Sequence, residues 1–127
     1  MAVKRPRIKV LVVDDHRVFA EAVAIALGLD PGVTAKVASS GPEALAAVQR
    51  IKPDVVLMDL EMPSVNGHQA LPLVKAYQPD LPVVAVTAYA MAGDSERCRA
   101  EGFDDYISKP YDIVQLRELV ARLAAQR

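Results

Sequence analysis

The chain has 127 residues, of which 52% are hydrophobic and 24% charged, and its formal net charge is −1. This length suits one domain with a single buried core. The charge balance favours neither a nucleic-acid surface nor an acidic membrane surface, and no apolar run approaches the roughly 18 residues of a membrane span. We therefore expect a single cytoplasmic domain over 1–127, with a core at about 8–124 and a basic tail at 1–7.

Short apolar runs recur along the chain and predict strands. Most are rich in valine and isoleucine and nearly continuous in hydrophobicity, which is typical of strands covered on both faces. The run at 34–37 has the weakest strand pattern. The five runs lie at 8–13, 34–37, 55–58, 83–86 and 105–107.

Apolar residues at helical spacing follow each of these runs. A fourth helix is expected at 93–101, ending at Gly102 and burying the single cysteine, Cys98. Pro72 fits the third helix only if it lies near the first turn. Strand and helix thus alternate five times, which predicts a parallel sheet with helices on both faces. The other stripes are Phe19, Ala22, Val23 and Ala26; Leu45, Val48 and Ile51; Leu71 and Val74; and Ile113, Leu116, Val120 and Leu123.

Polar side chains stand at the ends of four predicted strands. Asp14 and Asp15 follow the first strand, Asp59 the third and Thr87 the fourth, and Lys109 comes shortly after the fifth. In an open parallel sheet, ligands bind at the carboxyl ends of the strands, so these residues should converge. Each has a simpler alternative: a helix cap for either Asp14 or Asp15, though not for both, and a turn for Asp59. Thr87 could be a cap or a strand-end residue, and Lys109 an ordinary surface lysine.

The chemistry of this set is coherent. Carboxylates gathered closely repel one another unless a cation joins them, and Mg²⁺ prefers oxygen ligands of this kind. Asp59 can then act as a carboxylate nucleophile, while Lys109 and Thr87 contact the transferred phosphoryl oxygens. We expect His16 to be an exposed helix-start residue, since imidazole suits Mg²⁺ less well.

Five short motifs in this order resemble the receiver domain of two-component response regulators, over nearly the whole chain. That resemblance implies a flavodoxin-like, doubly wound α/β fold with strand order 2-1-3-4-5. The motifs are Val-Val-Asp-Asp at 12–15, Leu-Met-Asp-Leu-Glu-Met-Pro at 57–63, Asn-Gly at 66–67, Val-Thr-Ala at 86–88 and Asp-Tyr-Ile-Ser-Lys-Pro at 105–110.

The resemblance also assigns roles. Asp59 is implied as the phosphoacceptor, with Lys109 as the phosphate-binding lysine, a cis Lys109–Pro110 bond, and Thr87 with Tyr106 as the switch pair. Asp14, Asp15, Asp59 and the backbone carbonyl of Glu61 are the implied ligands of a Mg²⁺ cofactor. The implied phosphodonor is a phosphohistidine on a sensor kinase or phosphotransfer protein. A downstream protein or a second copy would bind the face of the fourth helix, fifth strand and fifth helix, with no direct contact to nucleic acid or membrane.

Two other functions compete with this phosphoacceptor switch, which is not an enzyme in the usual sense. A haloacid-dehalogenase-type hydrolase also uses an aspartate nucleophile, but needs a second aspartate two residues later, where this chain has Glu61. A phosphorylation-independent binding module would not need Asp14, Asp15, Asp59 and Lys109 together. Whether the domain acts alone or within a larger regulator or hybrid kinase stays open at this point.

Overall fold

The computed structural model describes residues 7–63, 65–109 and 111–126. Strands and helices alternate along these residues, as the sequence predicts. The strands are β1 (Ile8–Val13), β2 (Val33–Ala38), β3 (Val55–Asp59), β4 (Val83–Thr87) and β5 (Asp105–Ser108). The helices are α1 (Arg17–Gly28), α2 (Gly41–Ile51), α3 (Gly67–Tyr77), α4 (Asp94–Glu101) and α5 (Ile113–Ala125).

The strands form one parallel sheet in the order β2-β1-β3-β4-β5. This confirms the doubly wound fold and the strand order. Each strand lies within two residues of its prediction, including β2, whose sequence pattern was the weakest. Asp59 and Thr87 prove to be the last residues of β3 and β4 rather than the residues that follow them.

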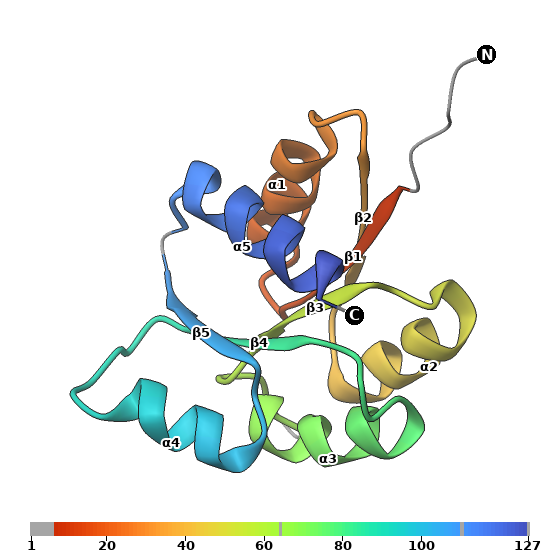
Figure 1. Ribbon diagram of the computed structural model, residues 1–127. Helices are drawn as coiled ribbons and strands as arrows, with labels where there is room; N and C mark the ends of the chain where they lie inside the picture. The colour runs from red at the N-terminus through yellow and green to blue at the C-terminus, as the bar shows by residue number, and fades with distance from the viewer. Residues whose placement is uncertain (1–6, 64, 110, 127) are drawn as a thin grey trace.

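Two apolar layers enclose the sheet, with α1 and α5 on one face and α2, α3 and α4 on the other (Figure 1). Alternate residues of a strand point to opposite faces. In β3, Val55 and Leu57 therefore pack under α1 and α5, while Val56 and Met58 pack toward α2 and α3. Both faces of the central strands are buried, which explains their unbroken hydrophobicity.

Helix α3 continues through Pro72, which lies in the second turn and not in the first. Proline has no N–H to donate to the carbonyl four residues earlier, and its presence inside a helix costs about 3 kcal/mol. Burial of Leu71 and Val74 against the sheet offsets that cost. At α4, Gly102 ends the helix at a φ of 124°, as expected, and Cys98 is buried. No helix among the described residues is long and apolar enough to cross a membrane.

Gly67 allows α3 to begin directly beneath the end of β3. A Cβ atom at this position would lie 2.5 Å from the backbone carbonyl oxygen of Asp59. The obstacle is backbone, which cannot rotate away as a side chain would. The close approach therefore fixes the chain segment that carries Asp59.

We predict that Gly67→Ala lowers the free energy of unfolding by about 1–3 kcal/mol, because the added methyl group overpacks the site. Gly28→Ala is the matched control, since a Cβ there meets nothing within 4 Å, and we expect no loss of stability. Urea denaturation of the three proteins is the measurement. Equal stability of Gly67→Ala and the wild type would contradict this role of Gly67.

Candidate functional site

Two buried carboxylates stand side by side at the carboxyl edge of the sheet. Asp14 directly follows β1 and Asp59 ends β3, and these strands are neighbours at the point where the strand order reverses. Asp14 is 1% exposed and Asp59 is 2% exposed. The crevice at such a reversal is where open α/β sheets bind ligands.

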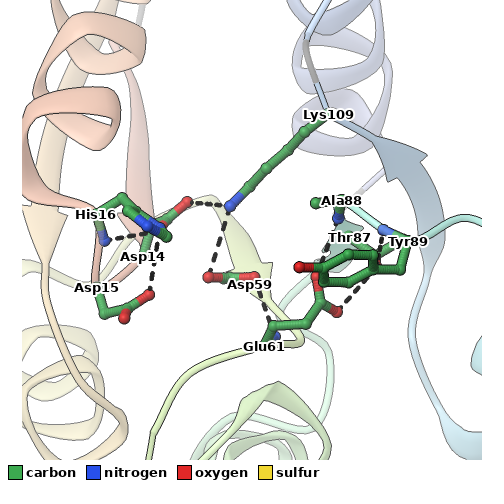
Figure 2. A network of polar contacts seen from close by, with 9 residues as sticks. All are labelled: Asp14, Asp15, His16, Asp59, Glu61, Thr87, Ala88, Tyr89 and Lys109. Carbon is green, nitrogen blue, oxygen red and sulfur yellow. Dashed lines mark hydrogen bonds and ion pairs between the residues drawn. The ribbon is translucent and has the colours of Figure 1, made fainter.

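Lys109 brings a positive charge to both carboxylates (Figure 2). Its backbone N–H donates to the carbonyl of Thr87 at 2.8 Å, which aligns the chain beyond β5 with the end of β4. Its Nζ lies 2.7 Å from Oδ2 of Asp14 and 3.6 Å from Oδ2 of Asp59. The convergence that the sequence predicts for these three residues is therefore confirmed.

Burial raises the pKa of Asp59 to about 6, and the nearby charge of Asp14 acts in the same direction. A hydrogen bond from the backbone N–H of Glu61 to Oδ1 of Asp59 (3.0 Å) and the charge of Lys109 oppose that rise. Burial alone would lower the pKa of Lys109, but its contacts with Asp14 and Asp59 raise it above the ordinary value. The Lys109 ammonium therefore stays charged, and its single positive charge is shared between two carboxylates.

The acidic pair and His16 form a cluster that can hold a metal ion. One ligand atom from each of Asp14, Asp15 and His16 lies within 4.8 Å of the others. The Asp15 side chain is 30% exposed, and that of His16 is 76% exposed. Apart from its ion pair with Lys109, Oδ2 of Asp14 has no hydrogen-bond partner among the described residues, which leaves a lone pair for a cation. A hard ion with oxygen ligands fits this donor set.

The capping alternative for the aspartates is wrong. His16 is the N-cap of α1 and makes no side-chain capping bond, whereas Asp14 accepts a hydrogen bond from the backbone of His16 at 2.9 Å. The turn alternative for Asp59 is correct in part, since Asp59 accepts from Glu61 two residues later. That bond leaves Oδ2 of Asp59 directed to Lys109.

Thr87 is buried at the end of β4, and its hydroxyl donates to Oε2 of Glu61 at 2.8 Å. Oε1 of the same carboxylate accepts from the backbone N–H of Ala88 at 2.9 Å. Figure 2 shows Glu61 reaching from the β3 side to the end of β4, next to the Tyr89 ring. The sequence indicated a role for the Glu61 backbone carbonyl alone, so this side-chain contact was missed.

A pair of stacked aromatic rings lies beside Lys109, and the sequence did not predict it. The rings of Phe19 and Tyr111 stack with centroids 5.4 Å apart, and Nζ of Lys109 lies 5.2 Å from the centroid of Phe19. Burial, with the charges of Asp14 and Asp59, raises the pKa of the Tyr111 phenol. The sequence held one signal for this contact: Tyr111 lies two residues after Lys109, and residues two apart in an extended chain point to the same side.

Tyr106 lies half-buried in β5 on the same face as Thr87, one side-chain pair further from the carboxyl edge. Its hydroxyl is 3.5 Å from Oδ2 of Asp94 at the start of α4, a long contact. The proposed cis bond between Lys109 and Pro110 involves a residue outside the described ones and stays a prediction. The metal-ligand role of the Glu61 carbonyl also stays a prediction.

Comparison with known proteins agrees with this geometry. A family model, the response regulator receiver domain, matches residues 10–121. The probable transcriptional regulatory protein TcrX of Mycobacterium tuberculosis is 39% identical over 118 residues, covering 93% of this chain and 49% of that protein. The sensor histidine kinase RcsC of Salmonella typhi is 36% identical over 112 residues, covering 88% of this chain and 12% of that protein.

The solved receiver domain of Francisella response regulator 1452 superposes with a TM-score of 0.85 at 29% identity, covering 96% of this chain and 98% of that one. The protein therefore belongs to the receiver-domain family of two-component signalling. It spans half or less of the curated relatives named above. Those relatives are a transcriptional regulator and a sensor kinase, so family membership leaves the larger context open.

The raised pKa of Asp59 generates a prediction about stability. Between pH 3.8 and about 6, the unfolded chain has lost a proton that folded Asp59 retains. The wild type therefore loses stability as pH rises through this window, and Asp59→Asn does not. In metal-free buffer at pH 7, we expect Asp59→Asn to be more stable on the order of 1–3 kcal/mol, with no difference below pH 4.

Thermal or urea unfolding from pH 3.5 to 8 measures this difference, and Asp30→Asn, an exposed aspartate, is the control. Adding Mg²⁺ should narrow the difference at pH 7 by stabilising the wild type. A difference between the wild type and Asp59→Asn that does not change with pH would contradict the account.

Proposed function

We propose that this receiver domain is a phosphorylation-controlled switch in which Asp59 accepts a phosphoryl group from a phosphohistidine. The donor is a sensor histidine kinase or a phosphotransfer protein, and the reaction depends on Mg²⁺. One observation carries the proposal: Lys109 stands between two buried carboxylates, Asp14 and Asp59, at the edge of the sheet. The domain acts as a phosphoacceptor, not as an enzyme that turns over a small substrate.

In the transfer, an oxygen of Asp59 forms a bond to phosphorus while the bond from phosphorus to the donor imidazole nitrogen breaks. The electron pair of that bond stays on the departing nitrogen, which takes a proton from solvent. Oδ1 of Asp59 is held by the Glu61 N–H, so Oδ2 is the attacking atom. Lys109 lies 3.6 Å from Oδ2 and can follow the charge onto the phosphoryl oxygens.

Asp14, Asp15, Asp59 and the backbone carbonyl of Glu61 would hold the Mg²⁺ ion. When bound, the ion neutralises charge on the phosphoryl oxygens and on the carboxylates around it. Asp14 is already oriented for this role, because the His16 N–H holds its Oδ1 while Oδ2 carries only the ion pair with Lys109. With part of its charge taken up by the ion, Asp14 would hold Lys109 less strongly, and the Lys109 ammonium could then contact the phosphoryl oxygens.

The phosphoryl signal passes to the face made by α4, β5 and α5. Thr87 turns its hydroxyl toward the phosphoryl group, and Tyr106 on the neighbouring strand rotates into the space that is released. A downstream protein or a second copy of the domain then binds this face. Asp105 on this face pairs with Arg99 of α4 at 3.0 Å and with Arg122 of α5 at 2.7 Å. A shift of α4 would therefore change the arrangement of charged side chains on this face.

The protein would act in the cytoplasm, without direct contact to nucleic acid.

The central prediction concerns labelling. With acetyl phosphate and Mg²⁺, the protein should gain one phosphoryl group on Asp59, and Asp59→Asn should gain none. Removal of Mg²⁺ with a chelator should abolish the labelling, and Asp30→Asn should label like the wild type. Intact-mass and peptide mass spectrometry are the measurements. Labelling that survives in Asp59→Asn would contradict Asp59 as the acceptor, whereas steady hydrolysis of a small phosphate ester would favour the hydrolase alternative.

A second prediction concerns transmission. Thr87→Ala should still bind beryllofluoride, a phosphoryl mimic, because Asp59 and Lys109 remain. The change at the α4–β5–α5 face should be largely lost, since a ligand shifts two states only through contacts that differ between them. Amide chemical shifts of Tyr106 and Leu119, with sedimentation to follow self-association, measure that change. Thr87→Ser is the control, and an equal response in Thr87→Ala and wild type would exclude Thr87 as the coupling residue.

A further inference from the structure

The Glu61 carboxylate accepts hydrogen bonds from two donors at the end of β4. Its Oε2 accepts from the Thr87 hydroxyl at 2.8 Å and its Oε1 from the Ala88 N–H at 2.9 Å. The backbone N–H of Tyr89 donates to Oγ1 of Thr87 at 3.0 Å. That third contact occupies a lone pair of the hydroxyl and leaves its single proton for Glu61.

An anion on Asp59 would need the same donors. The backbone N–H of Glu61 donates to Oδ1 of Asp59 at 3.0 Å, and Asp59 pairs with Val86, the residue before Thr87, on the neighbouring strand. The Glu61 carboxylate therefore accepts from donors that stand next to the phosphoacceptor. A hydroxyl carries one proton and cannot donate to two acceptors at full strength. Two anions that approach the same donor also repel each other. Glu61 and a phosphoryl group on Asp59 therefore exclude each other at Thr87.

We propose that the Glu61 side chain is an internal competitor of the phosphoryl group, which holds Thr87 in the unphosphorylated arrangement until the phosphoryl group displaces it. The inference rests on the proposed function at Asp59 and adds a residue that sets how readily the site switches. Glu61 acts here as a positioning residue through Thr87, and takes no part in the transfer of phosphorus.

The structure provides a place for the displaced carboxylate. A hollow of about 280 Å³ opens beside Thr87 between α3 and α4. Its lining includes the carboxylates of Asp94 and Glu101 as well as Glu61, His68 and Arg97. Arg97 pairs with Asp94 on the rim of this hollow. A carboxylate that swings away from Thr87 can approach the Arg97 guanidinium, which couples its release to the start of α4.

The test compares apparent dissociation constants for beryllofluoride in the presence of Mg²⁺, by calorimetry or ¹⁹F NMR. Glu61→Ala removes the competitor. Glu61→Gln keeps the shape, but its amide offers only one acceptor oxygen to two donors. Both variants should bind beryllofluoride roughly 3- to 10-fold more tightly than the wild type. The effect is modest because the bond from Thr87 is only part-buried and the bond from Ala88 is exposed, so water replaces much of their strength when Glu61 leaves. Glu96→Gln, an exposed carboxylate on α4, is the control for loss of charge and should bind like the wild type.

A double-mutant cycle separates competition from a merely structural role. In the Thr87→Ala background, Glu61→Ala should tighten binding much less, since one of the two shared donors, the Thr87 hydroxyl, is gone. Equal affinity of wild type, Glu61→Gln and Glu61→Ala would overturn the competitor while leaving the phosphoacceptor intact. The same gain with and without Thr87 would also overturn it. Failure of every variant and the wild type to bind beryllofluoride would overturn the proposed function, and the competitor with it.

Discussion

The site depends on one electrostatic constraint, the burial of two carboxylates with a single ammonium between them. Asp14 and Asp59 are nearly inaccessible to water, and Lys109 contacts both. Removing charges from water costs several kcal/mol per ion unless partners compensate, and one ammonium cannot neutralise two carboxylates. Burial is the main reason that the pKa of Asp59 rises to about 6, and the charge of Asp14 adds to the rise. The fold thus maintains an excess of negative charge at the site. A divalent cation would balance this charge, and a phosphoryl group could then bind to Asp59.

The sheet imposes this constraint, because Asp14 directly follows β1 and Asp59 ends the neighbouring β3. The apolar side chains of these two strands are packed in the two apolar layers. Gly67 lets α3 pack directly under the end of β3, which restricts the position of the Asp59 backbone. Charge at the site can therefore be relieved only by what binds there or by the side chains around it. In the proposed switch, Glu61 and Thr87 are the side chains that move, and the hollow beside Arg97 would link them to α4.

The sequence was sufficient for the fold and for the carboxylate–lysine core of the site. Valine-rich runs predicted the strands, and because parallel strands share a carboxyl edge, residues such as Asp59 and Lys109 had to converge. The contact between Glu61 and Thr87 could not be predicted, since it depends on a side-chain rotamer at a loop and not on periodicity. The stacking of Phe19 on Tyr111 joins opposite ends of the chain. Apolar spacing placed Phe19 on a buried helix face but said nothing about its neighbour.

A crystal structure of the Mg²⁺–beryllofluoride complex tests the central claim most directly, because it reports on the acceptor, the cation and the switch together. The account predicts beryllium bonded to an oxygen of Asp59, fluorides in contact with Lys109 and the Thr87 hydroxyl, Mg²⁺ on Asp14, and the Glu61 carboxylate moved away from Thr87. Beryllofluoride bound elsewhere, or Mg²⁺ away from Asp14, would contradict the phosphoacceptor site. A complex on Asp59 in which Thr87 still donates to Glu61 would contradict the proposed switch.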